Sequence, residues 1–281
     1  MPLCSIITAA GSDDARLTLE CWNSIAAQRD LGGWELEWCV QEDGAAPSLH
    51  ERLPPDERIR YDAAGTRYGV ATTRNLALAR ARGEVVRVLD QDDLLLPLAL
   101  HDQLSTFEKH PQAVWVAARA ADLLPDGSKR LVEVDFPTGV VECGALVRAW
   151  RATGRFPVHC AGVGLKTSVA RAFGGWAALP RSEDLSLLAA VSNVFAGVHL
   201  ASVDFYYRQW PGQTTRTERF VEAKGVAWRS VHQRAEAVAE VFRTADSALV
   251  ALRGAGLPVR GTASGPLPHQ ATAVREQPRT R

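Results

Sequence analysis

The sequence lacks an excess of charge of either sign and any long apolar run. Its 281 residues carry 32 basic and 32 acidic side chains, so the formal net charge is zero. This balance excludes the broad basic surface with which proteins neutralise nucleic-acid phosphates or acidic lipids. No stretch approaches the ~18 to 20 apolar residues that a membrane-spanning helix requires, and no signal-peptide pattern opens the chain. We therefore expect a cytoplasmic protein without a transmembrane anchor.

Cysteines are few and show no motif. The five, Cys4, Cys21, Cys39, Cys143 and Cys160, form no C-x-x-C pair and have no zinc-ligand spacing. Most of them lie among apolar residues, where a free cysteine behaves as a small hydrophobic side chain. We expect reduced thiols and no redox or zinc chemistry.

The first half of the sequence alternates short apolar runs with helical patterns. Residues 3–9 (LCSIITA) are apolar and rich in β-formers, and the runs at 34–40, 58–61 and 84–89 predict three further strands. Strands and helices that alternate over short links are typical of an open, doubly wound α/β sheet. Because the carboxyl ends of such strands meet at one edge, the acidic groups Glu42-Asp43 and 90–93 should face the same cleft.

Two helices are predicted between these strands. The first has apolar residues at helical spacing over 17–25, and caps are offered by Ser12, Asp13 and Asp14. The second covers 69–82, and its apolar side is predicted to comprise Val70, Leu76 and Leu78.

The second half is less regular. The pattern predicts a helix at 97–110, a hairpin at 113–134 around the turn 125–128, a helix at 182–195 with Ser182 as its cap, a strand at 203–207 and a long amphipathic helix at 217–252. From Gly254 onward, glycine, proline, serine and charged residues predominate, which predicts disorder.

Asp90-Gln91-Asp92-Asp93 is the strongest local signal for chemistry. Three carboxylates in four residues repel one another unless a cation lies between them, and oxygen ligands of this kind suit Mg²⁺ or Mn²⁺ with substrate phosphates completing the coordination. The alternative is an ordinary helix N-terminus, where the macrodipole favours aspartate.

The stretch from Tyr68 to Pro97, YGVATTRNLALARARGEVVRVLDQDDLLLP, resembles the family 2 glycosyltransferases of the GT-A fold. The resemblance rests on a Gly-Val-Ala, an Arg-Asn pair, a helix ending in Ala-x-Gly-Glu, an apolar strand and Asp-x-Asp-Asp. SIITAA near the N-terminus, SIAAQ at 24–28 and the turn at Asp43-Gly44 are also similar to that family. The resemblance covers the first hundred residues well and continues with fewer matching residues to Arg216.

The resemblance implies a nucleotide site at the first half of the chain, made by Thr8, Ala9, Ala10, Asp43, Arg74, Asp90 and Gln91. Asp43 would accept the imide N–H of uracil, thymine or guanine, and Glu42 stands where the family has a first aspartate. Arg74 would lie beside the base or the diphosphate, with a surface helix charge as the alternative. Asp90 would approach the ribose, and Asp92, with Asp90, would bind Mn²⁺ or Mg²⁺. Asn75 is expected to pair with backbone and hold the loop.

The resemblance also implies a catalytic carboxylate at Glu183-Asp184, after the Gly-Gly-aromatic turn at 174–176. In an inverting transfer a carboxylate removes the proton of the acceptor hydroxyl as it attacks the anomeric carbon. We expect Asp184 to be this base, with Glu183 the close alternative. On residue pattern alone, both are merely favourable first-turn residues of a helix.

Residues expected at the acceptor or the phosphates are Trp176, His159, Arg208, Trp210 and Arg216. A core position is the alternative for Trp176, a structural role is the more frequent one for a lone histidine such as His159, and surface charge is the alternative for Arg216. Tyr206 to Gly212 resembles the family's closing Tyr-Arg-x-His segment, but Trp210 occupies the place of the histidine. Where that histidine would bind metal, His199 or a water would have to replace it.

These observations predict a GT-A type α/β fold with an open, mostly parallel sheet flanked by helices and a long terminal helix. The expected division is a nucleotide-sugar-binding half at 1–105, an acceptor-binding and catalytic half at 106–216, a helix at 217–255 and a disordered tail at 256–281. The expected function is inverting, metal-dependent transfer of a hexose-like sugar from a nucleotide diphosphate, preferably UDP, to a hydroxyl of a small metabolite or glycan.

Two alternatives stay open from the sequence. A nucleotidyltransferase shares an open α/β sheet and an acidic metal site, although the acidic residues 12–14 disfavour it because a basic phosphate loop should follow its first strand. A non-catalytic nucleotide-sugar-binding protein of the same fold is the other. The oligomeric state is also open, and the long helix offers a face for a homodimer.

Overall fold

The computed structural model describes residues 1–11 and 15–254, with side chains up to 247. The strands are β1 (Leu3–Gly11), β2 (Glu35–Asp43), β3 (Ile59–Ala63), β4 (Val85–Val88), β5 (Leu94–Leu95), β6 (Trp115–Leu123), β7 (Lys129–Leu131), β8 (Gly139–Val141), β9 (Val163–Lys166) and β10 (Gly197–Arg208). The α-helices are α1 (Ala15–Ala26), α2 (Val70–Arg80), α3 (Ala99–Lys109), α4 (Ala145–Thr153), α5 (Thr167–Ala172), α6 (Glu183–Val194), α7 (Glu218–Glu222) and α8 (Lys224–Gly254), and short 3₁₀ turns lie at Leu49–Glu51, Cys160–Gly162 and Thr214–Arg216.

The strands form one mixed sheet in the order β3-β2-β1-β4-β9-β6-β10-β5, with β7 beside β6 and β8 beside β10. β1 pairs in parallel with both β2 and β4, and β2 with β3. β9 runs antiparallel to β4 and β6, so β6 and its parallel neighbour β10 point the same way as β1 to β4. The predicted open, mostly parallel sheet is confirmed, and the carboxyl ends of six strands share one edge.

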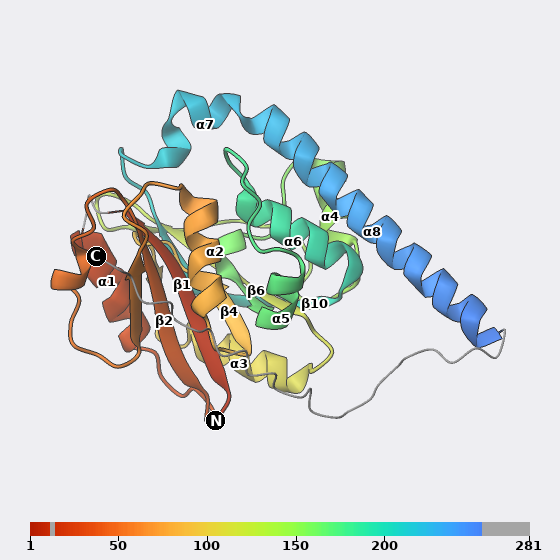
Figure 1. Ribbon diagram of the computed structural model, residues 1–281, viewed down its shortest axis with the longest axis horizontal. Helices are drawn as coiled ribbons and strands as arrows, with labels where there is room; N and C mark the ends of the chain where they lie inside the picture. Colours follow the sequence, from red (N-terminus) through yellow and green to blue (C-terminus); the bar gives the residue numbers. More distant parts are fainter. Residues whose placement is uncertain (12–14, 255–281) are drawn as a thin grey trace, which may run out of the picture. The chain divides into compact units, whose positions relative to one another are not determined.

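Helices cover both faces of this sheet (Figure 1). Alternate residues of β1 enter different cores: Ile6 packs with α1 and α3, whereas Ile7 packs with α2, α4, α5 and α6. This period of two follows from the pleat of a strand that is buried on both sides. A third cluster joins the first part of α8 to α4 and α6 through Val231 and Ala235, so the amphipathic character predicted for this helix is confirmed.

Several local predictions need correction. Val70 and Leu76 are exposed, because α2 instead buries Ala71, Thr73, Arg74, Ala77 and Leu78. Ser182 precedes α6 but its side chain makes no capping hydrogen bond. The hairpin at 113–134 is confirmed by the pairing of β6 with β7, and the long C-terminal helix is divided after α7. The proposed caps at 12–14 and the tail at 256–281 lie outside the described residues.

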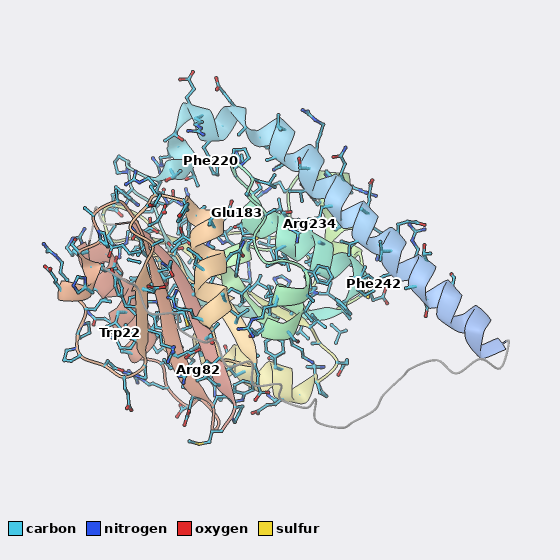
Figure 2. The ribbon with its side chains drawn as sticks, in the orientation of Figure 1. Trp22, Arg82, Glu183, Phe220, Arg234 and Phe242 are labelled. Atoms are coloured by element: carbon cyan, nitrogen blue, oxygen red, sulfur yellow. The ribbon has the colours of Figure 1, made fainter. Side chains whose placement is uncertain are left out.

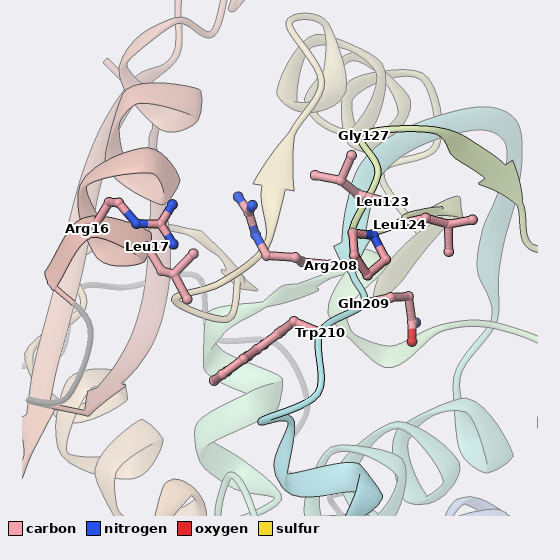
Figure 3. Close-up of a pocket in the computed structure, with 9 residues that line it drawn as sticks. Arg16, Leu17, Leu123, Leu124, Gly127, Arg208, Gln209 and Trp210 are labelled. Atoms are coloured by element: carbon pink, nitrogen blue, oxygen red, sulfur yellow. The ribbon is translucent and has the colours of Figure 1, made fainter.

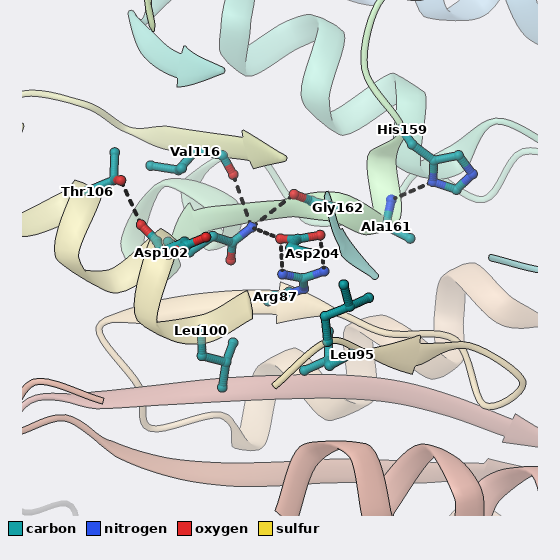
Figure 4. Close-up of polar contacts among 12 residues, drawn as sticks. Arg87, Leu95, Leu100, Asp102, Thr106, Val116, His159, Ala161, Gly162 and Asp204 are labelled. Atoms are coloured by element: carbon teal, nitrogen blue, oxygen red, sulfur yellow. Dashed lines mark hydrogen bonds and ion pairs between the residues drawn. The ribbon is translucent and has the colours of Figure 1, made fainter. Parts of the chain in front are cut away.

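A fully buried ion pair fastens the middle of the sheet to α3. Arg87 on β4 donates to both carboxylate oxygens of Asp204 on β10, at 2.6 and 3.1 Å (Figure 4). Gln103 of α3 donates to the same carboxylate and to the carbonyl of Gly162. A bidentate guanidinium–carboxylate pair with an added donor satisfies the buried charges, so this group holds elements together.

The chain divides into two compact units. The first, Met1–Glu240, contains the whole sheet, and the second, Val241–Arg281, begins within α8. In the described parts of both units, every helix is too short or too polar to cross a membrane.

Candidate functional site

Polar residues gather where the parallel strands end. Asp43 ends β2, Asp90 follows β4, Asp122 lies near the end of β6 and Arg208 ends β10. The side chain of Gln91 ties this edge together, since its oxygen accepts the backbone N–H of Gly11 at the end of β1, at 2.7 Å. The shared edge expected for the two acidic groups is therefore observed.

The two acids at the end of β2 differ in their partners. The carboxylate of Glu42 is buried and accepts the N–H groups of Ser48 and Leu49 and the hydroxyl of Tyr61, so it holds the following loop. Asp43 is only half-buried and accepts the N–H groups of Tyr68 and Gly69, directly before α2. Asp43 is thus the member of this pair that faces outward.

The end of β1 is more enclosed than the sequence predicted. Thr8 is fully buried, and its hydroxyl donates to the carbonyl of Leu89 at 2.7 Å and accepts the indole N–H of Trp38 at 2.8 Å. Ala10 is also fully buried, whereas Ala9 is half-buried. The side chains of Thr8 and Ala10 therefore belong to the enclosed strand end, whereas Ala9 retains exposed surface, and the assignment of the three residues to the nucleotide site stays a prediction.

Arg74 joins the two acidic motifs. Its side chain is 4% exposed and donates to Asp90 at 2.5 Å and to Glu183 at 2.7 Å. Burial works against its charge, but the carboxylates of Asp90, Glu183 and Asp184 raise the pKa of Arg74 above its usual value. This arginine is therefore no surface charge. It connects the end of β4 with the start of α6, where Glu183 lies close to α2 (Figure 2).

The acidic pair at the start of α6 is asymmetric. Glu183 is buried, whereas Asp184 is half-buried and accepts the N–H of Leu185. Burial first, and then the charge of Asp184, raise the pKa of Glu183 to about 7. The residue before the pair, Ser182, has a φ of 62°, a left-handed conformation that a side chain rarely adopts. Such strain is concentrated at functional sites, and Asp184 is the more exposed member of the pair.

The acidic turn after β4 fits a divalent cation by its chemistry. Burial and the neighbouring charge of Asp90 raise the pKa of Asp92 and, more strongly, of Asp93. Oδ2 of Asp93 is buried and makes no hydrogen bond, although Oδ1 accepts the N–H of Arg208. Crowded carboxylates with an unsatisfied oxygen match the oxygen donors that Mg²⁺ and Mn²⁺ prefer. Within 1–11 and 15–254, however, no three His, Cys, Asp or Glu side chains form a ready metal group.

The segment after β10 lies against this turn. Arg208 donates to the carbonyl of Asp92 and to the carboxylate of Glu20, and Trp210 donates its indole N–H to Oδ2 of Asp92 at 2.8 Å. Arg216 is exposed and donates to Gln209. His199 is buried at the opposite end of β10 and bonds to the carbonyl of Pro137, so it cannot replace a ligand beside Asp92.

Trp176 belongs to the core. It is 4% exposed and packs with the apolar residues under α2 and α6, which corrects the prediction that it faces the acceptor. Asn75 exchanges two hydrogen bonds with the backbone of Trp176, at 2.8 and 2.9 Å, so the expected backbone pairing of Asn75 is confirmed. Gly175 is required here, because a Cβ at this position would overlap the Asn75 amide.

His159 has mostly structural contacts. Its ring packs against Phe205 and Tyr207, and Nδ1 accepts the N–H of Ala161 at 3.4 Å. Burial lowers the pKa of His159, although Asp184 and Asp90 lie near enough to oppose that shift. A neutral imidazole therefore lies beneath the acidic site.

A cavity of about 340 Å³ opens beside the segment after β10 (Figure 3). Arg16 and Leu17 of α1 form one wall, and the β6–β7 turn forms the opposite wall. Arg208, Gln209 and Trp210 lie between the walls. Trp210 thus borders both this cavity and Asp92.

Sequence reasoning missed two contributors to the site. The carboxylate of Glu20 on α1 accepts a hydrogen bond from the guanidinium of Arg208 at 2.6 Å. Gln213 holds the segment through hydrogen bonds between its side chain and the backbone of Arg208 and Trp210. A helix pattern does not indicate contacts between α1 and a segment 188 residues away. Gln213 is buried, so its side chain serves the segment after β10.

The sequence matches a known protein family. The family model described as Glycosyl transferase family 2 matches residues 5–151. The chain belongs to this family. The match contains both the acidic turn after β4 and Arg74, and it ends before the acidic pair of α6.

The relatives are distant. Over 115 residues the chain is 30% identical to "Uncharacterized protein y4gI" of Sinorhizobium fredii (strain NBRC 101917 / NGR234), a match that covers 40% of this chain and 12% of that protein. The structure of S. aureus TarS 1-349 in complex with UDP-GlcNAc is similar with a TM-score of 0.60 at 18% identity, covering 80% of this chain and 65% of that one.

The UDP complex of the same protein gives a TM-score of 0.58 at 19% identity, covering 79% of this chain and 63% of that one. The chain thus spans less than two thirds of the proteins it resembles. At these identities the similarity establishes the fold, which is the expected GT-A type.

Proposed function

We propose that this member of glycosyltransferase family 2 is an inverting glycosyltransferase that moves a sugar from a nucleoside diphosphate, preferably UDP, to a hydroxyl acceptor. The observation that carries the proposal is the joining of two acidic motifs by Arg74, although 109 residues separate Arg74 from Glu183. One motif, Asp90 to Asp93, has the chemistry of a site for a diphosphate-bound cation. The other, Glu183-Asp184, has the chemistry of a general base.

The reaction needs a base, an oriented donor and a stabilised leaving group. Asp184 is half-buried and reachable, so we assign it the removal of the acceptor proton. The acceptor oxygen then bonds to the anomeric carbon as the bond from that carbon to the diphosphate oxygen breaks, with inversion. Glu183 keeps Arg74 in place and is too enclosed to contact an acceptor.

The donor nucleotide would lie along the edge between β2 and β4. Asp43 faces outward and can accept a base imide N–H, and Ala9 has exposed surface at the end of β1. TarS, whose fold this chain shares, has been crystallised with UDP and with UDP-GlcNAc, which supports a uridine donor.

A divalent cation would be held by Asp92, with Asp90 beside it. When bound, it neutralises the charge that develops on the departing diphosphate. Arg208 supports the same region from the protein side, since its guanidinium donates to the carbonyl of Asp92 and to the carboxylate of Glu20 on α1.

A thermal-shift panel of UDP, dTDP, GDP, ADP and CDP, each with and without Mn²⁺, tests the donor site. A ligand that binds only the folded state adds about 2.7 kcal/mol to the free energy of unfolding at a hundredfold excess over its Kd. We expect UDP with Mn²⁺ to give the largest shift and Asp92→Ala to remove it. The absence of any shift under all ten conditions would rule out the donor assignment.

Turnover separates an enzyme from a binding protein. UDP release from UDP-sugars in the presence of candidate acceptors should be abolished in Asp184→Asn, while UDP binding persists. A chain that binds UDP but releases none with any donor or acceptor would contradict the catalytic part of the proposal.

A further inference from the structure

Trp210 donates a hydrogen bond to the carboxylate that we propose as a cation ligand. The distance from its indole Nε1 to Oδ2 of Asp92 is 2.8 Å. An indole N–H is a donor only and has no free lone pair for a metal. Trp210 can therefore hold Asp92 but cannot bind the cation.

The indole is held in a defined place. A Cβ on Gly212 would overlap the ring of Trp210, so the ring lies directly against this glycine. Gln213 donates from its side chain to the carbonyl of Arg208 at 2.6 Å, and Arg208 is in turn bonded to the backbone of Asp92. The orientation of the Asp92 carboxylate is thus fixed from outside by a segment that is itself fastened to the acidic turn.

One oxygen of each carboxylate in the acidic turn is already engaged within the protein. Asp90 is already bonded to Arg74, Oδ2 of Asp92 is bonded to Trp210, and Oδ1 of Asp93 is bonded to the backbone of Arg208. Across the described ranges 1–11 and 15–254, no group of three metal-ligating side chains is assembled. Mg²⁺ in such sites is bound through one or two carboxylates, and substrate phosphates supply further ligands.

We infer that Trp210 is a positioning residue that orients Asp92 without touching the cation. The inference rests on the proposed function.

Mn²⁺ binding, followed by the electron paramagnetic resonance signal of the free ion, tests this directly. For the unaltered protein we expect Mn²⁺ to bind at least tenfold more tightly with UDP than without it. In Trp210→Phe the affinity measured with UDP should fall about 10- to 100-fold, the usual effect of removing a group that orients a metal ligand. Gly212→Ala should act in the same direction, because it displaces the indole without removing it.

A matched control is present in the same chain. Trp34 donates its indole N–H to the carboxylate of Glu108 at 2.7 Å, away from the acidic turn. Trp34→Phe removes the same type of hydrogen bond and should leave Mn²⁺ affinity unchanged. Trp210→His supplies a ring nitrogen that can bind a metal, so it should raise the affinity without UDP and narrow the difference that UDP makes.

The outcomes are distinct. Tighter Mn²⁺ binding in Trp210→Phe would show that the indole blocks Asp92 instead of orienting it, and unchanged binding would show that the indole does not affect Asp92; either result would overturn the inference. UDP binding, measured separately by calorimetry, distinguishes failure of this inference from failure of the proposed donor site. If UDP binds but Mn²⁺ does not bind to any variant, the inference fails while the nucleotide site stands; if UDP does not bind, the proposed donor site fails.

Discussion

Two arginines of this protein, Arg74 and Arg87, are both buried, with side chains 4% and 0% exposed, but lie in very different surroundings. Arg87 is in the middle of the sheet, where Asp204 receives both of its terminal nitrogens and Gln103 completes the group. Arg74 lies at the edge of the sheet, where it is shared between Asp90 and Glu183. We name these the Arg87 cluster (87, 103, 204) and the Arg74 cluster (74, 90, 183, 184).

The difference lies in charge balance and access. The Arg87 cluster has one positive and one negative charge, and both side chains are 0% exposed. The Arg74 cluster sets one positive charge against three carboxylates, and the Asp90 side chain is 34% exposed. A balanced, sealed pair serves to hold elements together, whereas an unbalanced and partly open group leaves negative charge available for a proton or a cation. Burial alone therefore does not distinguish a structural arginine from a functional one.

The largest effect should come from the most accessible acid of the Arg74 cluster. Asp184→Asn removes the proposed base while the amide still accepts the N–H of Leu185. We expect the turnover number to fall about 10²- to 10⁴-fold, the usual contribution of a general base. UDP affinity, measured by calorimetry, should remain within about twofold. Unchanged turnover would transfer the role of base to Glu183.

Substitutions in the Arg87 cluster should lower the free energy of unfolding. Arg87→Met leaves the carboxylate of Asp204 buried without its partner, which typically costs about 3–5 kcal/mol in the free energy of unfolding. Urea denaturation measures this loss. The double variant Arg87→Met with Asp204→Leu should recover most of it, because an apolar pair of similar volume needs no charge compensation. A single variant as stable as the original protein would show that the pair does not fasten the sheet.

The contrast between the clusters also shows what the sequence could predict. The apolar run at 3–9 and the acidic ends of β2 and β4 predicted the sheet and its functional edge, since these features are local and follow from strand geometry. Arg74 lies at a helix position that resembles a surface charge. Its partner Glu183 lies 109 positions further along the sequence, and a helix pattern does not indicate so distant a contact.

The same reasoning applies to two enclosed residues. Trp176 was expected at the acceptor because it follows two glycines in a loop, and Thr8 was expected at the nucleotide because of the resemblance to the family. Trp176 instead fills the core under α6, and Thr8 satisfies the carbonyl of Leu89 and the indole of Trp38. Which side of a strand end or turn faces outward depends on the tertiary partners, and these are not encoded in spacing. The resemblance to a family assigned more of the candidate site residues than the residue pattern did.

Arg74→Met should separate activity from stability. Glu183 already has a pKa near 7, so it can take up a proton when its partner is lost, and Asp90 can be solvated. The free energy of unfolding should therefore fall by less than in Arg87→Met. Turnover should decrease on the order of 100-fold, because the start of α6 is no longer held in position relative to the acidic turn. A stability loss as large as that of Arg87→Met would remove the distinction between the clusters.

The smallest effect should be a displacement of the pH profile. Burial and the adjacent Asp184 raise the pKa of Glu183 to about 7, so this group binds a proton as the pH falls below neutrality. Protonation weakens its ion pair with Arg74, and we expect kcat/KM to decline on the acid side of about pH 7. Glu183→Gln has no carboxyl that titrates there. Its profile should stay flat to lower pH, at a reduced maximum.

Glu183 should also make the free energy of unfolding depend on pH, in the direction opposite to that of kcat/KM. An acid whose pKa is higher in the folded state than its ordinary value of 4.5 binds more protons when folded, so the free energy of unfolding should decrease as the pH rises from about 4.5 to 7. Denaturation of the original protein and of Glu183→Gln across this window isolates the contribution. The difference between them should change with pH within the window and level off above it. A constant difference would mean that Glu183 titrates elsewhere and that its ion pair with Arg74 is balanced like that of Arg87.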